Sequence, residues 1–338
     1  MTPLSSTSPP VRLVDLGTTD WWKTQAVYHY LAEQCSADAP DTIVLCRPKT
    51  PYLCLGYHQD FDAVFDRRAC AQHNLPVLRR RLGGGATYLD SNQIFYQFIF
   101  HKSRVPVYFG EIYRRFLAPA VSTLRRFGLD AHLRMLNEIE IGSRRIAGIG
   151  GGQLGEACVV VGNFLLDFDY EMMSRAWRVP TETFRTMARD SMQERIVTLK
   201  KLRPDIDPDT LRQVYLEEVV KSFHNNISFS ALTSEEERNA EKTYRTLTSP
   251  EFLNLHTSEA DPAPMSELKI SAREFIHFRQ MQVNGYILSG SFRVREDKIV
   301  AVHLDSNPAG DWLAAERHLQ GRPLESWQSE IEKVVTHG

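Results

Sequence analysis

Three arginines at residues 79–81 and three glycines at residues 83–85 form the stretch of this sequence best suited to chemistry. Arginine carries a fixed positive charge and a planar fork of donors that matches phosphate and carboxylate oxygens. Consecutive glycines let backbone N–H groups approach an anion, because no Cβ is in the way. Residues 78–90 therefore predict a phosphate-binding loop. The alternative is a tight turn with solvated arginines, since no standard phosphate motif accompanies the glycines.

A second stretch of the same character follows Arg144 and Arg145. Gly148, Gly150, Gly151 and Gly152 predict a loop that is nearly free of side-chain bulk. Two glycine loops, each beside paired arginines, suggest one anionic ligand held from two sides. Two unrelated turns are the alternative.

Apolar spacing predicts the elements that would position these loops. Residues 109–127 should form a helix that ends at Gly128 and is kinked or divided by Pro119. An apolar strand at 159–169 should break at Gly162. We also expect a helix that begins at residues 20–22 and strands at 42–46, 52–55, 75–80, 93–100 and 136–141.

The remainder of the chain reads as helical up to about residue 245, then as a small α+β unit. Ser234 and Glu237 have the spacing of a capping box at a helix start. Residues 256–265 look like an exposed linker, because they include Pro262 and Pro264. Beyond them the pattern predicts a hairpin at 286–304 that turns at 296–298, and helices at 313–319 and 324–335.

Length and composition limit the class of protein. A chain of 338 residues is long enough for two domains, and 42% hydrophobic with 24% charged residues is ordinary for a globular protein. The formal net charge of −2 argues against a nucleic-acid binder. No apolar run reaches the length of a membrane span, so a cytoplasmic protein is expected. The five cysteines lack the spacing of a zinc site or a disulfide framework.

Several of these motifs together resemble the lipoate–protein ligases and their octanoyltransferase relatives. Arg79, Arg80, the glycines at 83–85, Ala86, Tyr88 and Asp90 are similar to the family's Arg-Arg-x-x-Gly-Gly-Gly-Ala-x-Tyr-x-Asp signature. Leu55–Gln59 resembles an early Ile-Gly-x-x-Gln element of the family, and Asn137–Ile139 resembles its Asn-Asp-Ile. Arg145–Gly148 resembles its Lys-Ile-Ser/Ala-Gly, and Gly162 follows at the interval of a later family glycine. Ser249–Phe252 resembles its Ser-Pro-Glu-Trp segment.

The resemblance implies an α+β fold: a mixed-sheet catalytic domain similar to that of biotin ligases, and a small C-terminal α+β accessory domain. The implied boundaries are a disordered tail at 1–11, the catalytic domain at 12–250, a linker at 251–265 and the accessory domain at 266–338.

The resemblance also implies the reaction. Such enzymes use ATP with Mg²⁺ to convert lipoate or octanoate into an acyl-AMP, then transfer the acyl group to a lysine of a lipoyl carrier. A glycine-cleavage H-like protein or a dehydrogenase lipoyl domain would be the partner, with no nucleic acid or membrane involved, and the enzyme is expected to be a monomer.

By the same resemblance, Arg145 and Arg80 would be catalytic, and Glu138 would be on the metal side. Arg145 stands where the family has lysine, and Glu138 where it has aspartate. The implied substrate- and ATP-binding residues are Arg79, Arg80, Gly83, Gly84, Gly85, Ala86, Tyr88, Asp90, Asn137, Glu138, Arg145, Gly148, Gly162 and His58.

Two other functions stay open at this point. Octanoyltransferases of this superfamily form an acyl-enzyme on a cysteine without ATP, and Cys158 is the candidate here. A cysteine on an apolar strand is more often a small buried side chain. A divergent, non-catalytic binding protein is the other alternative, because Arg145 departs from the family lysine. His58 is expected to be structural or at a pocket rim.

Overall fold

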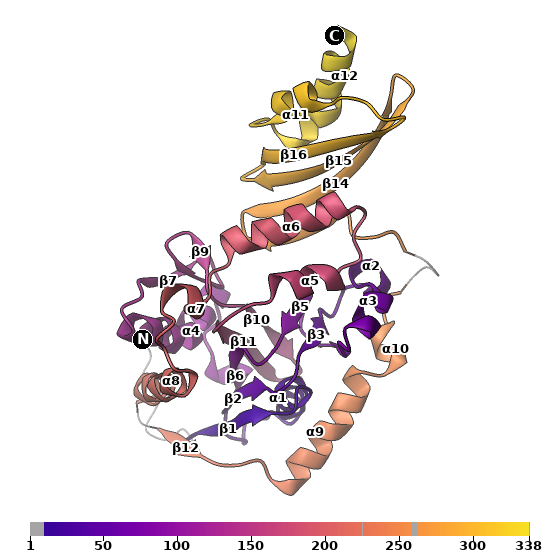
Figure 1. Ribbon diagram of the computed structural model, residues 1–338. Helices are drawn as coiled ribbons and strands as arrows, with labels where there is room; N and C mark the ends of the chain where they lie inside the picture. Colours follow the sequence, from indigo (N-terminus) through magenta and orange to yellow (C-terminus); the bar gives the residue numbers. More distant parts are fainter. Residues whose placement is uncertain (1–9, 225, 258–261, 338) are drawn as a thin grey trace. The chain divides into compact units, whose positions relative to one another are not determined.

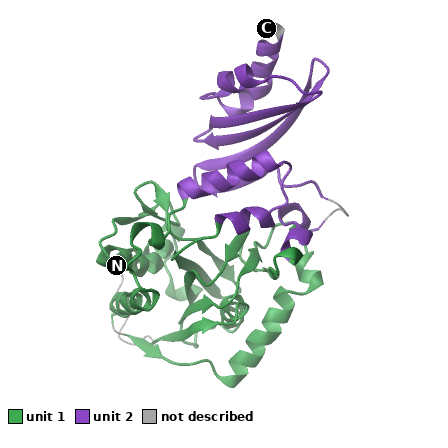
Figure 2. Ribbon diagram, viewed as in Figure 1, with its two compact units in different colours: residues 1–61, 71–169, 196–256 green, residues 62–70, 170–195, 257–338 purple. Residues whose placement is uncertain are grey.

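The computed structural model describes residues 10–224, 226–257 and 262–337 (Figure 1). By their contacts, residues 1–61, 71–169 and 196–256 form one compact unit, and residues 62–70, 170–195 and 257–338 form a second (Figure 2). This division places 62–70 and 170–195 with the C-terminal part. As functional domains, the ranges 12–250, 251–265 and 266–338 stay a prediction. The tail predicted at 1–11 falls outside the described residues except for its end, where Val11 already begins a strand.

The first unit is built on a six-stranded mixed sheet, as predicted. Two neighbouring pairs in it are parallel, β1 with β2 and β1 with β12, whereas the other pairs are antiparallel. In spatial order the strands are β10 (Ile149–Leu154), β11 (Ala157–Leu165), β6 (Gln93–His101), β2 (Thr42–Pro48), β1 (Val11–Thr19) and β12 (Ile227–Phe229).

Helices cover both faces of this sheet because its strands alternate between two apolar clusters. On β2, Ile43 packs with helices α4 (Phe109–Arg126) and α8 (Pro208–Ser222). The next residue, Val44, packs on the other face with α1 (Lys23–Glu33) and α9 (Ser234–Leu247). The predicted helices at α1 and α4 are thus confirmed.

Two details of the helix predictions differ in the structure. Helix α4 runs through Pro119 without being divided, while a kink at this proline stays a prediction. The helix ends just before Gly128, whose φ of 77° suits the predicted C-terminal cap. The capping box of α9 is formed by Thr233 and Glu236, one residue before the predicted pair, because the hydroxyl of Thr233 accepts the N–H of Glu236.

Two three-stranded sheets carry most of the predicted site residues. One joins β4 (Val77–Arg79), β3 (Tyr52–Leu55) and the unpredicted β5 (Thr87–Leu89), and the other joins β7 (Ala131–Arg134), β8 (Glu138–Ile141) and β9 (Arg144–Arg145). The remaining elements of this unit are the 3₁₀ helix η1 (Lys102–Arg104) and the short helices α7 (Leu199–Leu202) and α10 (Pro250–Leu253).

The second unit contains an antiparallel sheet of four strands, of which the sequence predicted two. The predicted hairpin is confirmed, and Glu296 and Asp297 turn it with positive φ. Helix α6 (Glu182–Arg195) packs on this sheet, where its Arg195 pairs with Glu274 of the sheet. Glu274 is a fully buried carboxylate that also pairs with Arg293. The other elements are α2 (Phe61–Val64), α3 (Arg67–Gln72), α5 (Tyr170–Ala176), β13 (Glu267–Ser271), β14 (Glu274–Val283), β15 (Tyr286–Arg295), β16 (Lys298–Asn307), α11 (Leu313–Leu319), η2 (Leu324–Ser326) and α12 (Trp327–His337).

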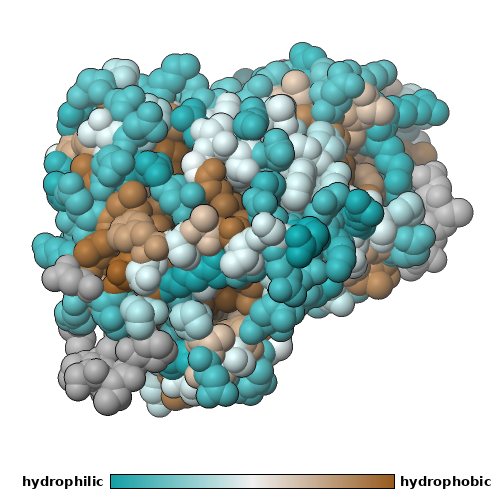
Figure 3. All heavy atoms as spheres, turned by 90° about the horizontal axis from the view of Figure 1, so that it is seen from below, coloured by the Kyte–Doolittle hydropathy of each residue, from teal (hydrophilic) through white to brown (hydrophobic). Residues whose placement is uncertain are grey.

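The surface in Figure 3 is mostly hydrophilic, with apolar side chains gathered in patches. Among the described residues, no helix combines the length and the apolar character that crossing a bilayer requires.

Candidate active site

The glycine loop between β4 and β5 has the geometry of an anion cradle. Gly83, Gly84 and Gly85 are exposed, and Gly84 has a φ of 91°, which favours glycine. The guanidinium of Arg80 donates to the carbonyls of Gly83 and Gly85, at 2.7 and 2.8 Å. Within the described chain, the N–H groups of these three glycines donate no hydrogen bond. Arg80 therefore holds the carbonyls and leaves a row of amides open to an anion.

The turn at residues 56–59 packs directly against this loop. A Cβ at Gly56 would lie 1.9 Å from the carbonyl oxygen of Gly84, so only glycine fits. The N–H of Tyr57 donates to Leu82 O at 3.0 Å. The exposed His58 also borders the loop, since its Cδ2 lies 3.9 Å from where a Cβ on Gly83 would be. That His58 contacts the ligand stays a prediction.

Arg79 does not line the cradle, which corrects the role inferred from the motif. Its side chain is fully buried, and its three nitrogens donate to five backbone carbonyls. Those carbonyls belong to Gly56 (3.1 Å), Tyr57 (2.7 Å), Gln59 (2.5 Å), Phe252 (2.8 Å) and Leu253 (2.5 Å). Its donors are thus occupied by the protein itself.

A residue that no motif suggested, His29 on α1, holds the other side of the loop. Its ring is fully buried; Nε2 accepts the N–H of Arg81 at 2.9 Å, while Nδ1 lies 2.8 Å from Gln25 O. This pattern assigns a neutral ring with its proton on Nδ1. The Arg81 side chain pairs with Glu33, so it does not simply face solvent.

We expect His29 to make the fold sensitive to acid. Burial, opposed by the bond to Gln25 O, lowers the pKa of His29 to about 3, whereas an unfolded histidine titrates near ~6.5. Between these values only the unfolded chain takes up the proton, so the free energy of unfolding falls as the pH drops below ~6.5, by up to about 1.4 kcal/mol per unit. Urea unfolding at several pH values should show a shallower dependence in His29→Gln. The same change at the exposed His224 should leave the slope unchanged, and equal slopes in all three proteins would contradict this role.

The second glycine-rich stretch is a strand and not a loop, which corrects that prediction. Residues 149–154 form β10, paired throughout with β11, and β11 itself continues unbroken through Gly162. The glycines allow close packing: a Cβ on Gly151 would lie 2.8 Å from the hydroxyl of Tyr113, and one on Gly152 would lie 3.2 Å from Leu82. Because Leu82 leads into the glycine loop, the two glycine-rich segments are still neighbours.

A buried chain of amides ties these segments together. The N–H of Gly148 donates to Asn163 Oδ1 at 2.6 Å, Asn163 Nδ2 donates to Gln93 Oε1 at 2.7 Å, and Gln93 Nε2 donates to Tyr88 O at 3.1 Å. Asn163 and Gln93 are 5% and 1% exposed, so their bonds are shielded from water. Sequence reasoning missed both, because nothing local marks a side chain whose partners lie far along the chain.

The other motif residues of this region, Tyr88, Asp90, Gly162 and Ala86, lie in or beside the strands, and their contact with a ligand stays a prediction. Asp90 is buried, accepts the N–H and side-chain amide of Asn92, and has its pKa raised by burial. The ring of Tyr88 is buried against Phe168, and burial raises the pKa of its hydroxyl. A Cβ on Gly162 would collide with the Tyr96 ring at 2.4 Å. Ala86 is half-buried, directly before β5.

Arg145 and Glu138 face each other across β8 and β9. Arg145 Nη1 lies 3.9 Å from Glu138 Oε1, and Glu138 is buried. Burial lowers the pKa of Arg145, and the charges of Glu138 and Glu140 oppose that shift. The carbonyl of Arg145 also accepts Val197 N–H at 2.9 Å, which fixes its backbone. The half-buried Asn137 lies in the turn before β8.

No protein-built metal centre is evident in the described ranges, where no three His, Cys, Asp or Glu side chains gather as a metal site would require. The metal role of Glu138 stays a prediction.

None of the five cysteines, all free thiols, has the environment of an activated nucleophile. Burial raises the pKa of every one, and that of Cys158 rises to about 11. A thiol with a raised pKa holds little thiolate at neutral pH, so Cys158 is a poor candidate for acyl transfer.

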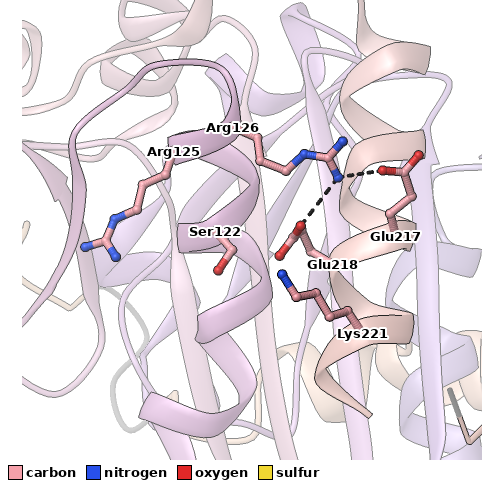
Figure 4. A pocket seen from close by; sticks show the side chains of 6 residues that line it. All are labelled: Ser122, Arg125, Arg126, Glu217, Glu218 and Lys221. Carbon is pink, nitrogen blue, oxygen red and sulfur yellow. Dashed lines mark hydrogen bonds and ion pairs between the residues drawn. The ribbon is translucent and has the colours of Figure 1, made fainter. Parts of the chain in front are cut away.

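Two surface hollows lie away from the glycine loop. A groove of about 660 Å³ runs between α4 and α8, where Arg126 pairs with Glu217 and Glu218 (Figure 4). A smaller hollow of about 210 Å³ lies beside β1 and β2. Neither is lined by a residue of the predicted site, so we do not assign the site to them. The groove is lined by Ser122, Arg125, Arg126, Glu217, Glu218 and Lys221.

Three curated relatives are similar to this chain at low identity. They are a lipoate-protein ligase A subunit 1 of Thermoplasma acidophilum (25% identical, covering 60% of this chain and 79% of the relative), a lipoate–protein ligase 1 of Staphylococcus aureus (23%, covering 57% of each) and an octanoyltransferase LipM of Kyrpidia tusciae (25%, covering 61% and 84%). The chain thus spans little more than half the length of the second.

Solved structures share the fold. The bipartite lipoate protein ligase of T. acidophilum, described with its E2 lipoyl domain, superposes with a TM-score of 0.65 at 22% identity over 75% of this chain and 98% of that one. A lipoate-protein ligase A bound with ATP gives 0.61 at 20% over 73% and 99%. P. falciparum LipL1 in complex with lipoate gives 0.58 at 13% over 98% and 100%. The model of the lipoyl protein ligase A/B catalytic domain matches residues 20–220, more than half of the sequence, and the chain therefore belongs to that family.

Proposed function

We propose that this protein is an ATP-dependent lipoate–protein ligase that activates lipoate or octanoate and transfers it to a lysine of a lipoyl carrier. The observation that carries the proposal is the exposed glycine loop, whose three glycine N–H groups donate no hydrogen bond among the described residues while Arg80 holds the carbonyls. The similar structures with bound ATP and bound lipoate support the choice of ligands.

The first step fits a site made of cations and amides. The carboxylate of the acid attacks the α-phosphorus of ATP, an acyl-adenylate forms and pyrophosphate leaves. This step needs positioning of two anions and neutralisation of developing charge more than proton transfer. The open amides and the guanidinium of Arg145 would supply that charge. The chain of Gln93 and Asn163 anchors the segment after Arg145 to strand β5, which follows the loop.

Magnesium would accompany the triphosphate. Mg²⁺ in nucleotide sites commonly takes one or two carboxylates and completes its shell with phosphate and water oxygens. The buried carboxylate of Glu138 fits the role of one such ligand, although it is shared with Arg145. The ion would neutralise phosphate charge.

In the second step the carrier lysine attacks the acyl carbonyl, an amide forms and AMP leaves. The T. acidophilum ligase described with its E2 lipoyl domain supports a carrier of this kind. The amine must be neutral to attack, although a free lysine has a pKa near ~10.4.

Exchange of labelled pyrophosphate into ATP tests the first step. The purified protein should exchange the label only when lipoate or octanoate is present, with biotin as the comparison acid. Absence of exchange with all three acids would refute the proposal and favour a non-catalytic binding protein.

The octanoyltransferase relative supports a second candidate, ATP-independent transfer. The raised pKa of Cys158 argues against that thiol as the nucleophile. We expect Cys158→Ser to keep acyl transfer to a lipoyl domain within about twofold of the wild-type rate, because the thiol is not acylated. Transfer should require ATP in both proteins. Transfer without ATP that disappears in Cys158→Ser would establish the transferase instead.

A further inference from the structure

We infer that the short helix α10, at residues 250–253, is a structural part of the anion site, and that Arg79 is the positioning residue that joins the two. The inference deepens the proposed function, and its kinetic test rests on that function. Helix α10 lies outside residues 20–220, the part matched by the family model.

Burying the charged side chain of Arg79 costs free energy unless its donors are paired. A buried charge is stable only when its polar atoms are paired, and Arg79 is fully buried. Its five acceptors are all backbone carbonyls, and none is a carboxylate. A guanidinium bonded to five backbone carbonyls fixes the segments that carry them, because each carbonyl must keep pointing at one of its nitrogens.

One side of Arg79 leads to the glycine loop. Three of its acceptors are carbonyls of the turn at 56–59. That turn presses Gly56 against the carbonyl of Gly84, and its Tyr57 N–H binds Leu82 O. The turn therefore cannot shift without moving the loop.

The other side leads to α10. The carbonyls of Phe252 and Leu253 are at the C-terminal end of this helix, where carbonyls lack helical partners and a cation is favourable. The start of the helix is held by Ser249, whose hydroxyl accepts the Phe252 N–H at 3.2 Å. Helix α10 is the last element of the first unit before the chain enters the second.

A pair of capping variants separates this positioning role from general stability. Ser249→Ala removes the cap of α10, and Thr233→Ala removes the equivalent cap of α9, which supplies none of the five carbonyls that Arg79 binds. The two changes should weaken their helices similarly. We expect Ser249→Ala to lower kcat/KM for acid-dependent pyrophosphate exchange by about tenfold, as when one or two charge-assisted bonds are strained, and Thr233→Ala to leave it unchanged.

Hydrogen exchange of the loop gives a readout that does not depend on the reaction. Peptides covering residues 80–90 should exchange faster in Ser249→Ala and faster still in Arg79→Lys, which lacks the planar fork, but not in Thr233→Ala. If the wild type fails to exchange pyrophosphate, the proposed function is wrong, while the coupling is still decided by this measurement. Equal protection of the loop in the two capping variants would overturn the inference.

Discussion

Replacing Arg145 by alanine should lower acid-dependent pyrophosphate exchange by roughly 100- to 1,000-fold, the usual effect of removing one electrostatic contact to a transition state. The side chain is 29% exposed and has Glu138 as its ion-pair partner at 3.9 Å, so part of its charge is available to a ligand. Its backbone is fixed by β8 on one side and Val197 on the other. The loss should appear in kcat, because the contact is strongest where phosphate charge develops.

The neighbouring Arg144 is the control. It is exposed on the same short strand, and Arg144→Ala should keep the wild-type rate. Arg145→Ala also removes one ion pair of the buried carboxylate of Glu138, so the folded fraction must be measured beside the rate. Arg145→Lys keeps the charge, and the resemblance places lysine here, so it should retain exchange within about tenfold. Wild-type exchange in Arg145→Ala would remove this residue from the catalytic role.

The fold was largely predictable where apolar periodicity is strong. Helices α1 and α4 and the hairpin β15–β16 follow their patterns because each buries one apolar face. Strand β10 was missed for the opposite reason. Its six residues include three glycines, which carry little strand propensity. The segment is a strand because β11 offers a full ladder and because Tyr113 and Leu82 need the space that side chains would fill.

The site was predictable as a location but not residue by residue. Adjacent arginines in a motif look equivalent, yet they do different things here. Arg79 donates to carbonyls that are distant in the sequence, whereas Arg80 donates to a carbonyl of the glycine loop itself. That difference depends on where residues 252 and 253 fold, which no local pattern contains. His29 illustrates the same limit, because a single histidine on a helix gives no sign that it accepts a backbone N–H from residue 81.

Gly56→Ala should be the most damaging change of a single methyl group. The new Cβ would lie 1.9 Å from the carbonyl oxygen of Gly84, and that neighbour is backbone, which cannot rotate away. Overpacking of this kind typically lowers the free energy of unfolding by about 1–3 kcal/mol. The relief available is movement of the glycine loop, and a displacement near ~1 Å can reduce a reaction rate by about 100-fold. Urea unfolding and pyrophosphate exchange measure the two effects separately.

Gly110→Ala is the matched control, because its Cβ would meet only Leu136 Cδ2, at 3.4 Å, and because alanine is the better helix former at this position in α4. It should fold and react as the wild type does. If Gly56→Ala retains both stability and exchange, the turn at 56–59 is free to move away from the loop. In that case the contact with Gly84 would not determine where the open amides point. Arg79 could then not position the glycine loop through this turn.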